Sequence, residues 1–164
     1  VYKRQEYMNI NFVEMINQTT GEFAEKFEKR NLQIVLNVPE KPVMVRTDGR
    51  RMWRVIENIY NNAAKYALEG TRVYADLIEK EHTVEFSLKN ISEQPLNISA
   101  DELTERFIRG DVSRSTEGSG LGLSIAKNLT ELQGGKFELY LDGDLFKVTI
   151  VFPKAVVGQS VTKS

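Results

Sequence analysis

Residues 57–67 read ENIYNNAAKYA, which places Asn58, Asn61 and Asn62 inside an otherwise amphipathic helical pattern. Asparagine is a poor helix former because its short amide competes for backbone hydrogen bonds. At about 100° per residue, Asn58, Asn62 and Lys65 lie on one side of the helix, beside the apolar stripe that faces the core. The stretch therefore predicts a core helix with a polar stripe that serves something other than stability.

The side chains of this polar stripe suit a phosphate group and its metal ion. An asparagine carbonyl oxygen is a good ligand for Mg²⁺, and the same amide can donate to a phosphate oxygen. Lys65 supplies a positive point charge for the same phosphates. The stripe is typical of a Mg²⁺ and phosphate site, but the helix taken alone favours a solvated polar face. Asn61 lies to one side and is expected to face water.

The glycine-rich sequence GSGLGL, residues 118–123, runs directly into another helical pattern. Glycines can adopt positive φ, and they let a ligand approach the backbone closely. The start of a helix presents free N–H groups to an anion. The preceding segment, residues 91–119, is long and polar, as functional lids are. It contains Arg106, Arg109 and Arg114. Because arginine forks match phosphate oxygens, the segment predicts a phosphate-binding loop, with a flexible hinge as the alternative.

Periodic patterns in the rest of the chain predict one layered domain. Helices are expected at 11–30, weakened at Gly21, at 49–68 with Asp48 as N-cap, and from the glycine loop to Gly134. Paired strands are expected in three places, namely 32–39 with 42–47, 71–81 with 82–90, and a hairpin within 135–153. This order predicts an α+β fold, a two-layer α/β sandwich whose mixed, mostly antiparallel sheet is covered on one face by three helices.

The composition is that of a single globular domain. At 164 residues the chain has room for one core, expected at 1–154, followed by a loose tail at 155–164. Lys and Arg total 22 against 23 Asp and Glu, so no charge excess points to nucleic acid or an anionic membrane. The lack of cysteine excludes disulfides and thiolate metal sites, and no apolar run approaches the roughly 20 residues of a membrane span.

Three motifs in a fixed order carry a family resemblance, N-x-x-x-N-A-x-K-Y at 58–66, E-R-F-x-R-G-D at 105–111 and G-x-G-L-G-L at 118–123. From residue 9 to residue 153, the chain resembles the ATP-binding catalytic domain of bacterial sensor histidine kinases. The resemblance implies the Bergerat fold shared with gyrase B, mismatch-repair and heat-shock-chaperone ATPases. It also implies that residues 91–119 form an ATP lid.

The resemblance implies ATP and Mg²⁺ as cofactors and gives roles to residues of the matching motifs. Asn62 would be the Mg²⁺ ligand, and Tyr66 would pack beside the nucleotide. Lys65 and Arg109 would contact phosphates. The implied catalytic residues are Asn58, Asn62, Lys65 and Arg109. The implied nucleotide-binding residues are Asn58, Asn62, Lys65, Tyr66, Asn90, Arg109, Gly118, Ser119, Gly120, Leu121, Gly122 and Leu123.

Three positions decide what chemistry the resemblance implies. Asn90 stands where the family carries an aspartate that accepts from the adenine amino group, and its amide oxygen can accept that bond without a charge. Asn58 stands where ATP-hydrolysing relatives carry a glutamate general base, and an amide cannot take that proton. His82 is the only histidine and begins a strand, so it is expected to be an exposed turn residue.

The implied function is transfer of the γ-phosphoryl group of Mg-ATP to a histidine in two-component signal transduction. The implied partners are a histidine-bearing dimerisation domain of the same or a sister chain and, indirectly, a response regulator. Neither nucleic acid nor direct membrane contact is expected, and the implied location is the cytoplasmic portion of a membrane-bound sensor. A serine kinase of the anti-sigma-factor type and a non-catalytic nucleotide-binding scaffold stay open as alternatives.

Overall fold

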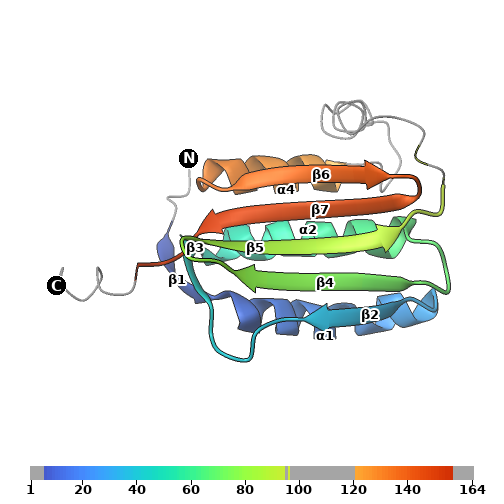
Figure 1. Ribbon diagram of the computed structural model, residues 1–164, viewed down its shortest axis with the longest axis horizontal. Coiled ribbons are helices and arrows are strands. Elements are labelled where there is room, and N and C mark those ends of the chain that lie inside the picture. Colours follow the sequence, from blue (N-terminus) through green and yellow to red (C-terminus); the bar gives the residue numbers. More distant parts are fainter. Residues whose placement is uncertain (1–5, 95, 97–120, 157–164) are drawn as a thin grey trace.

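Figure 1 shows the computed structural model, which describes residues 6–94, 96 and 121–156. Residues 157–164 of the predicted tail and 97–119 of the predicted lid lie outside the described residues, as do the predicted site residues Arg109, Gly118, Ser119 and Gly120. The elements follow in the order β1 (Tyr7–Asn11), α1 (Phe12–Lys29), β2 (Gln33–Asn37), β3 (Met44–Asp48), α2 (Gly49–Tyr66), β4 (Arg72–Glu79), β5 (Thr83–Ile91), α4 (Leu121–Leu132), β6 (Lys136–Asp142) and β7 (Leu145–Pro153).

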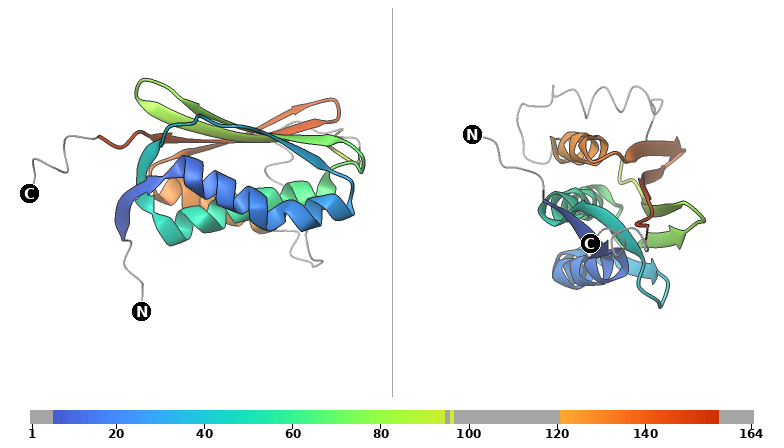
Figure 2. Two further views of the ribbon diagram at one scale, coloured as in Figure 1. Left: turned by 90° about the horizontal axis from the view of Figure 1, so that it is seen from below. Right: turned by 90° about the vertical axis from the view of Figure 1, so that its left-hand side faces the viewer.

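Within the described chain, the main sheet has five strands in the order β2-β4-β5-β7-β6 (Figure 1). β2 pairs with β4 in parallel, and the other neighbouring pairs of this sheet are antiparallel. The helices α1, α2 and α4 lie side by side on one face of the sheet, with α2 in the middle (Figure 2). The predicted α+β sandwich with a mixed, mostly antiparallel sheet is therefore confirmed.

The predicted hairpin between residues 32–39 and 42–47 is wrong. β2 pairs with β4, where Gln33 opposes Arg72, and β3 pairs instead with β1, where Tyr7 opposes Asp48. The pair β1 and β3 forms a separate two-stranded sheet, and β1 was not among the predicted strands. Alternation in the sequence identifies a strand but not its partner, because pairing depends on segments that are distant along the chain.

Tyr60 holds α2 against the rest of the core, and its side chain is fully buried. Its ring stacks on Phe86 of β5 with 6.3 Å between centroids, and on Phe27 of α1 with 6.1 Å. Its hydroxyl lies 2.7 Å from the Thr20 hydroxyl, so the polar end of the side chain is hydrogen-bonded. Burial raises the pKa of Tyr60 to about 12, and the Thr20 hydrogen bond opposes part of this rise.

We expect the Tyr60 phenol to make the domain sensitive to alkali. Because its folded pKa lies above the unfolded value of 10.0, its contribution to stability is complete below pH 10 and is lost as the pH rises towards 12. The free energy of unfolding should fall by about 1.4 kcal/mol per pH unit in that window. Tyr60→Phe should lack this fall, whereas Thr20→Val should keep it. Urea titrations at several alkaline pH values measure the slope, and equal slopes in Tyr60→Phe and the native chain would contradict this account.

Asp48 caps the start of α2, as predicted. Its Oδ1 accepts from the backbone N–H of Arg50 at 3.1 Å and of Arg51 at 3.3 Å, and its Oδ2 accepts from that of Glu6 at 3.0 Å. Burial raises the pKa of this carboxyl, but these hydrogen bonds and the Arg51 charge outweigh it, so the pKa lies below its ordinary value. The backbone N–H of Asp48 donates to Gln133 Oε1 at 2.9 Å, so the start of α2 lies beside the end of α4.

Candidate functional site

Asn58 and the glycine-rich motif are distant in sequence but lie together in the structure. Gly122, in the first turn of α4, faces Asn58 of α2, since a methyl group at Gly122 would lie 3.6 Å from Asn58 Oδ1. The Nδ2 of Asn58 is buried and has no hydrogen-bond partner among the described residues. A buried donor without an acceptor costs about 1–3 kcal/mol. The contact between α2 and the start of α4 therefore presents a donor that a ligand oxygen can satisfy.

The other two asparagines of α2 have different surroundings. Asn61, expected simply to face water, is half-buried, and its Oδ1 accepts from Lys26 Nζ of α1 at 3.1 Å. Asn62 is half-buried, and Lys65 lies exposed near the end of the helix. Asn61 thus belongs to the contact between α1 and α2, a pairing that the sequence did not indicate.

Asn90 lies on the helix-facing side of β5 and is 4% exposed. The buried residues that alternate along this side of the strand are Val84, Phe86, Leu88 and Asn90. Just beyond it, the backbone N–H of Glu93 donates to the carbonyl of Tyr66 at 2.9 Å, and Ser92 forms a β-bridge with Ala67. β5 therefore brings Asn90 to the C-terminal end of α2. Buried polar groups are normally hydrogen-bonded, so a polar ligand suits this position.

Arg30 fastens the C-terminal end of α2 to the segment that follows β5. Its Nη1 donates to the carbonyl oxygens of Ala64 at 2.9 Å and Lys65 at 3.2 Å, and its Nη2 lies 3.4 Å from Glu93 Oε1. A cation suits this place because the last carbonyls of a helix lack intrahelical partners and carry the negative end of its dipole. Sequence reasoning missed Arg30 because its partners are at least 34 residues away and no motif surrounds it.

The start of α4 offers backbone groups to a ligand. The first four N–H groups of an α-helix have no intrahelical acceptor, and here they belong to residues 121–124. Leu123 was predicted in the nucleotide-binding set, but its side chain is 1% exposed and packs in the core, so only its backbone can reach a nucleotide. Gly122 does not have a positive φ, so its missing side chain matters for ligand approach and not for backbone conformation.

Residues 47–156, which run from the end of β3 past the end of β7, match the family described as histidine kinase-, DNA gyrase B- and HSP90-like ATPase. The matched range includes Asn58, Asn62, Asn90 and Gly122. The chain therefore belongs to this family of ATP-binding domains.

Within this family, the chain is similar to sensor kinases. The sensor protein KdpD of Clostridium acetobutylicum is 33% identical over 148 residues, which cover 84% of this chain and 16% of KdpD. The sensor protein VanSC of Enterococcus gallinarum is 30% identical over 142 residues, which cover 85% of this chain and 39% of VanSC. The chain thus spans well under half the length of these curated relatives.

The fold is also that of a solved kinase domain. The catalytic domain of the histidine kinase ThkA, in a nucleotide-free form, has a TM-score of 0.79 at 25% identity, covering 91% of this chain and 96% of that one. The resemblance to the ATP-binding catalytic domain of sensor histidine kinases is therefore confirmed. None of the described helices is long and apolar enough to cross a membrane.

Gly122→Ala is expected to weaken ATP binding about tenfold and to leave the fold intact. The added methyl would meet Asn58 at an ordinary van der Waals distance, and alanine is a better helix former than glycine by about 1 kcal/mol. The same methyl would occupy space that a phosphate needs in order to approach the backbone. Calorimetry with Mg²⁺ and an ATP analogue measures the affinity, and thermal melting checks the fold. Unchanged affinity would show that no phosphate approaches Gly122.

Proposed function

We propose that this chain binds Mg-ATP and transfers its γ-phosphoryl group to a histidine on a dimerisation domain, in the same or a sister chain. The observation that carries the proposal is the buried Nδ2 of Asn58, which has no acceptor among the described residues and belongs to a side chain whose Oδ1 faces Gly122 at the start of α4. A phosphate oxygen would satisfy this donor, and the N–H groups of residues 121–124 would hold the same phosphates. The exposed Lys65 would add positive charge.

Asn62 would hold Mg²⁺ together with phosphate oxygens of the nucleotide. In the part of the chain that the structure describes, no group of three or more His, Cys, Asp or Glu could hold a metal ion. A neutral amide oxygen on a half-buried side chain suits Mg²⁺, which prefers oxygen ligands and commonly binds through substrate phosphates. When bound, the ion neutralises charge on the transferring phosphoryl group.

The residue at position 58 favours transfer over hydrolysis. Asn58 occupies the place from which a general base would act on water, and its amide cannot take that proton. An imidazole nitrogen brings its own lone pair, which forms the N–P bond while the P–O bond to the bridging oxygen breaks. ADP leaves with that electron pair, and the other ring nitrogen releases its proton to water. Such a step requires positioning and charge stabilisation from the protein, and no general base.

The position of His82 supports a phosphoacceptor on another domain or chain. His82 is the only histidine of the sequence, and its side chain is 85% exposed in the turn before β5. It is eight residues away from Asn90, roughly 26 Å along an extended strand. His82 and the proposed site therefore lie at opposite ends of the sheet.

Transfer is tested with labelled ATP, this chain and a panel of sensor-kinase dimerisation domains supplied in trans, that of KdpD among them. We expect an acid-labile label on the histidine of the acceptor domain, dependent on Mg²⁺. An acid-stable label would identify a serine kinase of the anti-sigma-factor type instead. ATP binding without any labelled histidine would reject transfer, and no ATP binding up to millimolar concentration would favour a non-catalytic scaffold.

We also propose a place for the domain in the cell, in the cytoplasm as part of a membrane-bound sensor that acts indirectly on a response regulator. The relatives KdpD and VanSC are both named sensor proteins, which supports this placement. Fractionation of cells that express the full-length protein, followed by detection of this domain and protease treatment of intact cells, tests it. Cleavage of the domain by external protease would reject it.

A further inference from the structure

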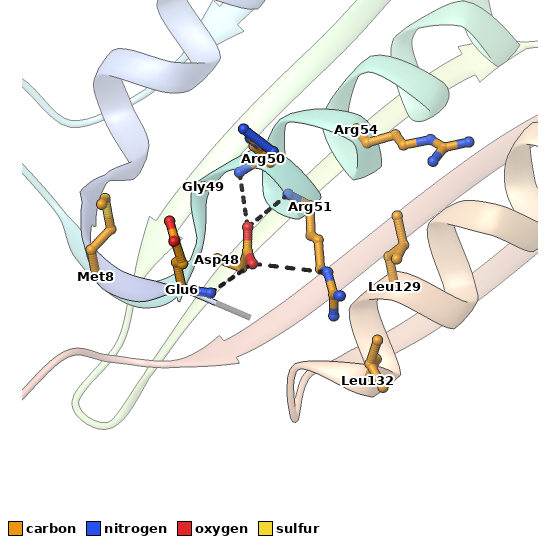
Figure 3. A pocket seen from close by; sticks show the side chains of 9 residues that line it. All are labelled: Glu6, Met8, Asp48, Gly49, Arg50, Arg51, Arg54, Leu129 and Leu132. Carbon is orange, nitrogen blue, oxygen red and sulfur yellow. Dashed lines mark hydrogen bonds and ion pairs between the residues drawn. The ribbon is translucent and has the colours of Figure 1, made fainter. Parts of the chain in front are cut away.

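A groove at the far end of α2 has no part in the proposed chemistry. It has a volume of about 780 Å³ and is lined by Glu6, by Met8 of β1, by the first two turns of α2 and by the last turns of α4. Figure 3 shows these side chains about the start of α2, with Leu129 and Leu132 of α4 on one side and Met8 of β1 on the other. Gly49 at the start of α2 is thirteen residues from Asn62, about 20 Å of helix. Most of the groove therefore lies away from the nucleotide site, and its near end is at Arg54, one turn of α2 before Asn58.

Three arginines of the groove lie at the N-terminal end of α2, where the helix dipole is unfavourable for positive charge. Arg50, Arg51 and Arg54 lie in the first two turns of α2, beside the positive end of its dipole, and the first turn holds no acidic residue. Asp48 faces them, but three backbone N–H groups engage its two oxygens (Figure 3). Among the residues described, no ion pair reaches Arg50 or Arg54, and Nη1 of Arg51 is buried without an acceptor. The exposed guanidiniums of Arg50 and Arg54 are available to carboxylates from another molecule, whereas Arg51 pairs with Asp48 at 3.9 Å.

Apolar side chains form the other part of the groove and lie partly in water. Leu132 of α4 is 54% exposed and Met8 of β1 is 50% exposed. Leu129 lies one turn before Leu132 on the same face of α4. Leu129 and Leu132 lie beside Arg51 and Arg54 and form an amphipathic surface with them, while Met8 lies on the other side of Asp48 (Figure 3). A small anion would leave the apolar side chains in water.

We propose that this groove docks an acidic amphipathic helix of a partner protein. Apolar side chains one turn apart on that helix would pack against Leu129 and Leu132, as an amphipathic helix lays its apolar face in a groove. Carboxylates that flank its apolar stripe would face Arg50 and Arg54. The docking does not require bound ATP.

Shape and charge together select a helix over a membrane surface. Asp48 at the start of α2 contacts Gln133 just after α4, and Asn58 farther along α2 contacts the start of α4, so the two helices run antiparallel. The groove lies at one end of this pair, beside the first two turns of α2 and the last turns of α4, where a third helix can pack against both. A flat anionic membrane would bring its charge against the carboxylates of Glu6 and Asp48 as well.

The test uses two synthetic helical peptides with the same leucine stripe, one with glutamates and one with lysines at the flanking positions. Titrated into the isotope-labelled chain, the glutamate peptide is expected to shift the amide NMR signals of residues 49–54 and 129–133. Its affinity should weaken about tenfold when salt is raised from 50 to 500 mM, because exposed charges are then screened. The lysine peptide should bind at least about tenfold more weakly.

Charge reversal supplies the matched controls. Arg50→Glu is expected to abolish the shifts and to retain Mg-ATP binding, since Arg50 lies eight residues before Asn58, about 12 Å along α2. Arg72→Glu changes an exposed arginine at the start of β4 and should leave the shifts unchanged. Equal binding of the two peptides, no binding, shifts that map elsewhere, or the same shifts from acetate or inorganic phosphate alone would each overturn the proposal.

Discussion

Asn62→Ala is expected to weaken Mg²⁺-dependent ATP binding and phosphoryl transfer on the order of 100-fold. The substitution removes the amide oxygen that is proposed to hold the metal ion. Alanine has a higher helix propensity than asparagine, so α2 should be at least as stable as before. The expected result is therefore a folded domain that has lost its metal-dependent affinity. Calorimetry with and without Mg²⁺, together with circular dichroism, measures both parts.

Asn61→Ala is the matched control for this experiment. It removes the same chemical group one residue away, from a side chain whose oxygen is bound to Lys26 of α1 at 3.1 Å. It should lose that hydrogen bond and bind Mg-ATP like the native chain. Asn62→Asp keeps an oxygen ligand and should retain Mg²⁺ dependence. Equal affinities of Asn62→Ala and Asn61→Ala would show that Asn62 is not the metal ligand.

Gly135→Ala is expected to destabilise the domain by about 3 kcal/mol and to lower its melting temperature by roughly 10 °C. Gly135 lies between α4 and β6, where the backbone runs close against β7. A methyl group there would lie 2.7 Å from Cε1 of Phe152 and 2.9 Å from the carbonyl oxygen of Val151. Phe152 is fixed in the core and the carbonyl belongs to the backbone of β7, so relief requires the strand to move.

Gly21→Ala provides the opposite case in the same chain. Gly21 lies inside α1, and a methyl group there would have no heavy atom within 4 Å apart from its chain neighbours and the nearby backbone of the helix. Alanine should therefore raise stability by about 1 kcal/mol through its helix propensity alone. Thermal melts of both variants under one condition measure the contrast. A Gly135→Ala variant that melts with the native chain would contradict the close packing of Gly135 on β7.

Elements that depend on neighbouring residues were predictable from this sequence. Asp48 precedes a helical period and caps α2, and the hairpin of β6 and β7 turns at Gly143, which has a φ of 63°. The partner of β2 was not predictable in this way. Gln33 pairs with Arg72, and nothing within the strand favours that distant partner over the strand that follows the PEKP turn. The error therefore lies in strand pairing and not in strand identity.

In the candidate site, too, the residues of local motifs were predictable from the sequence, and the contacts between distant residues were not. Asn58 and Gly122 were selected from motif chemistry, and the structure brings them into contact across two helices. A motif names residues without giving their direction, so it could not show that the side chain of Leu123 points into the core. Arg30 could not be found from the sequence, because its role depends on contacts that only the folded chain makes. These contacts are with backbone carbonyls at the end of α2 and with the carboxylate of Glu93.

The parallel pairing of β2 with β4 makes α2 part of a crossover connection. After β2, the chain must pass through β3 and all of α2 before β4 can pair with it. Closing a loop of this length costs chain entropy before the strand pair can form, so β2 is expected to join the sheet late in folding. The helix that carries Asn58 and Asn62 thus also lies inside the connection that must close when the sheet edge forms. Substitutions that loosen α2 should slow refolding as well as weaken nucleotide binding.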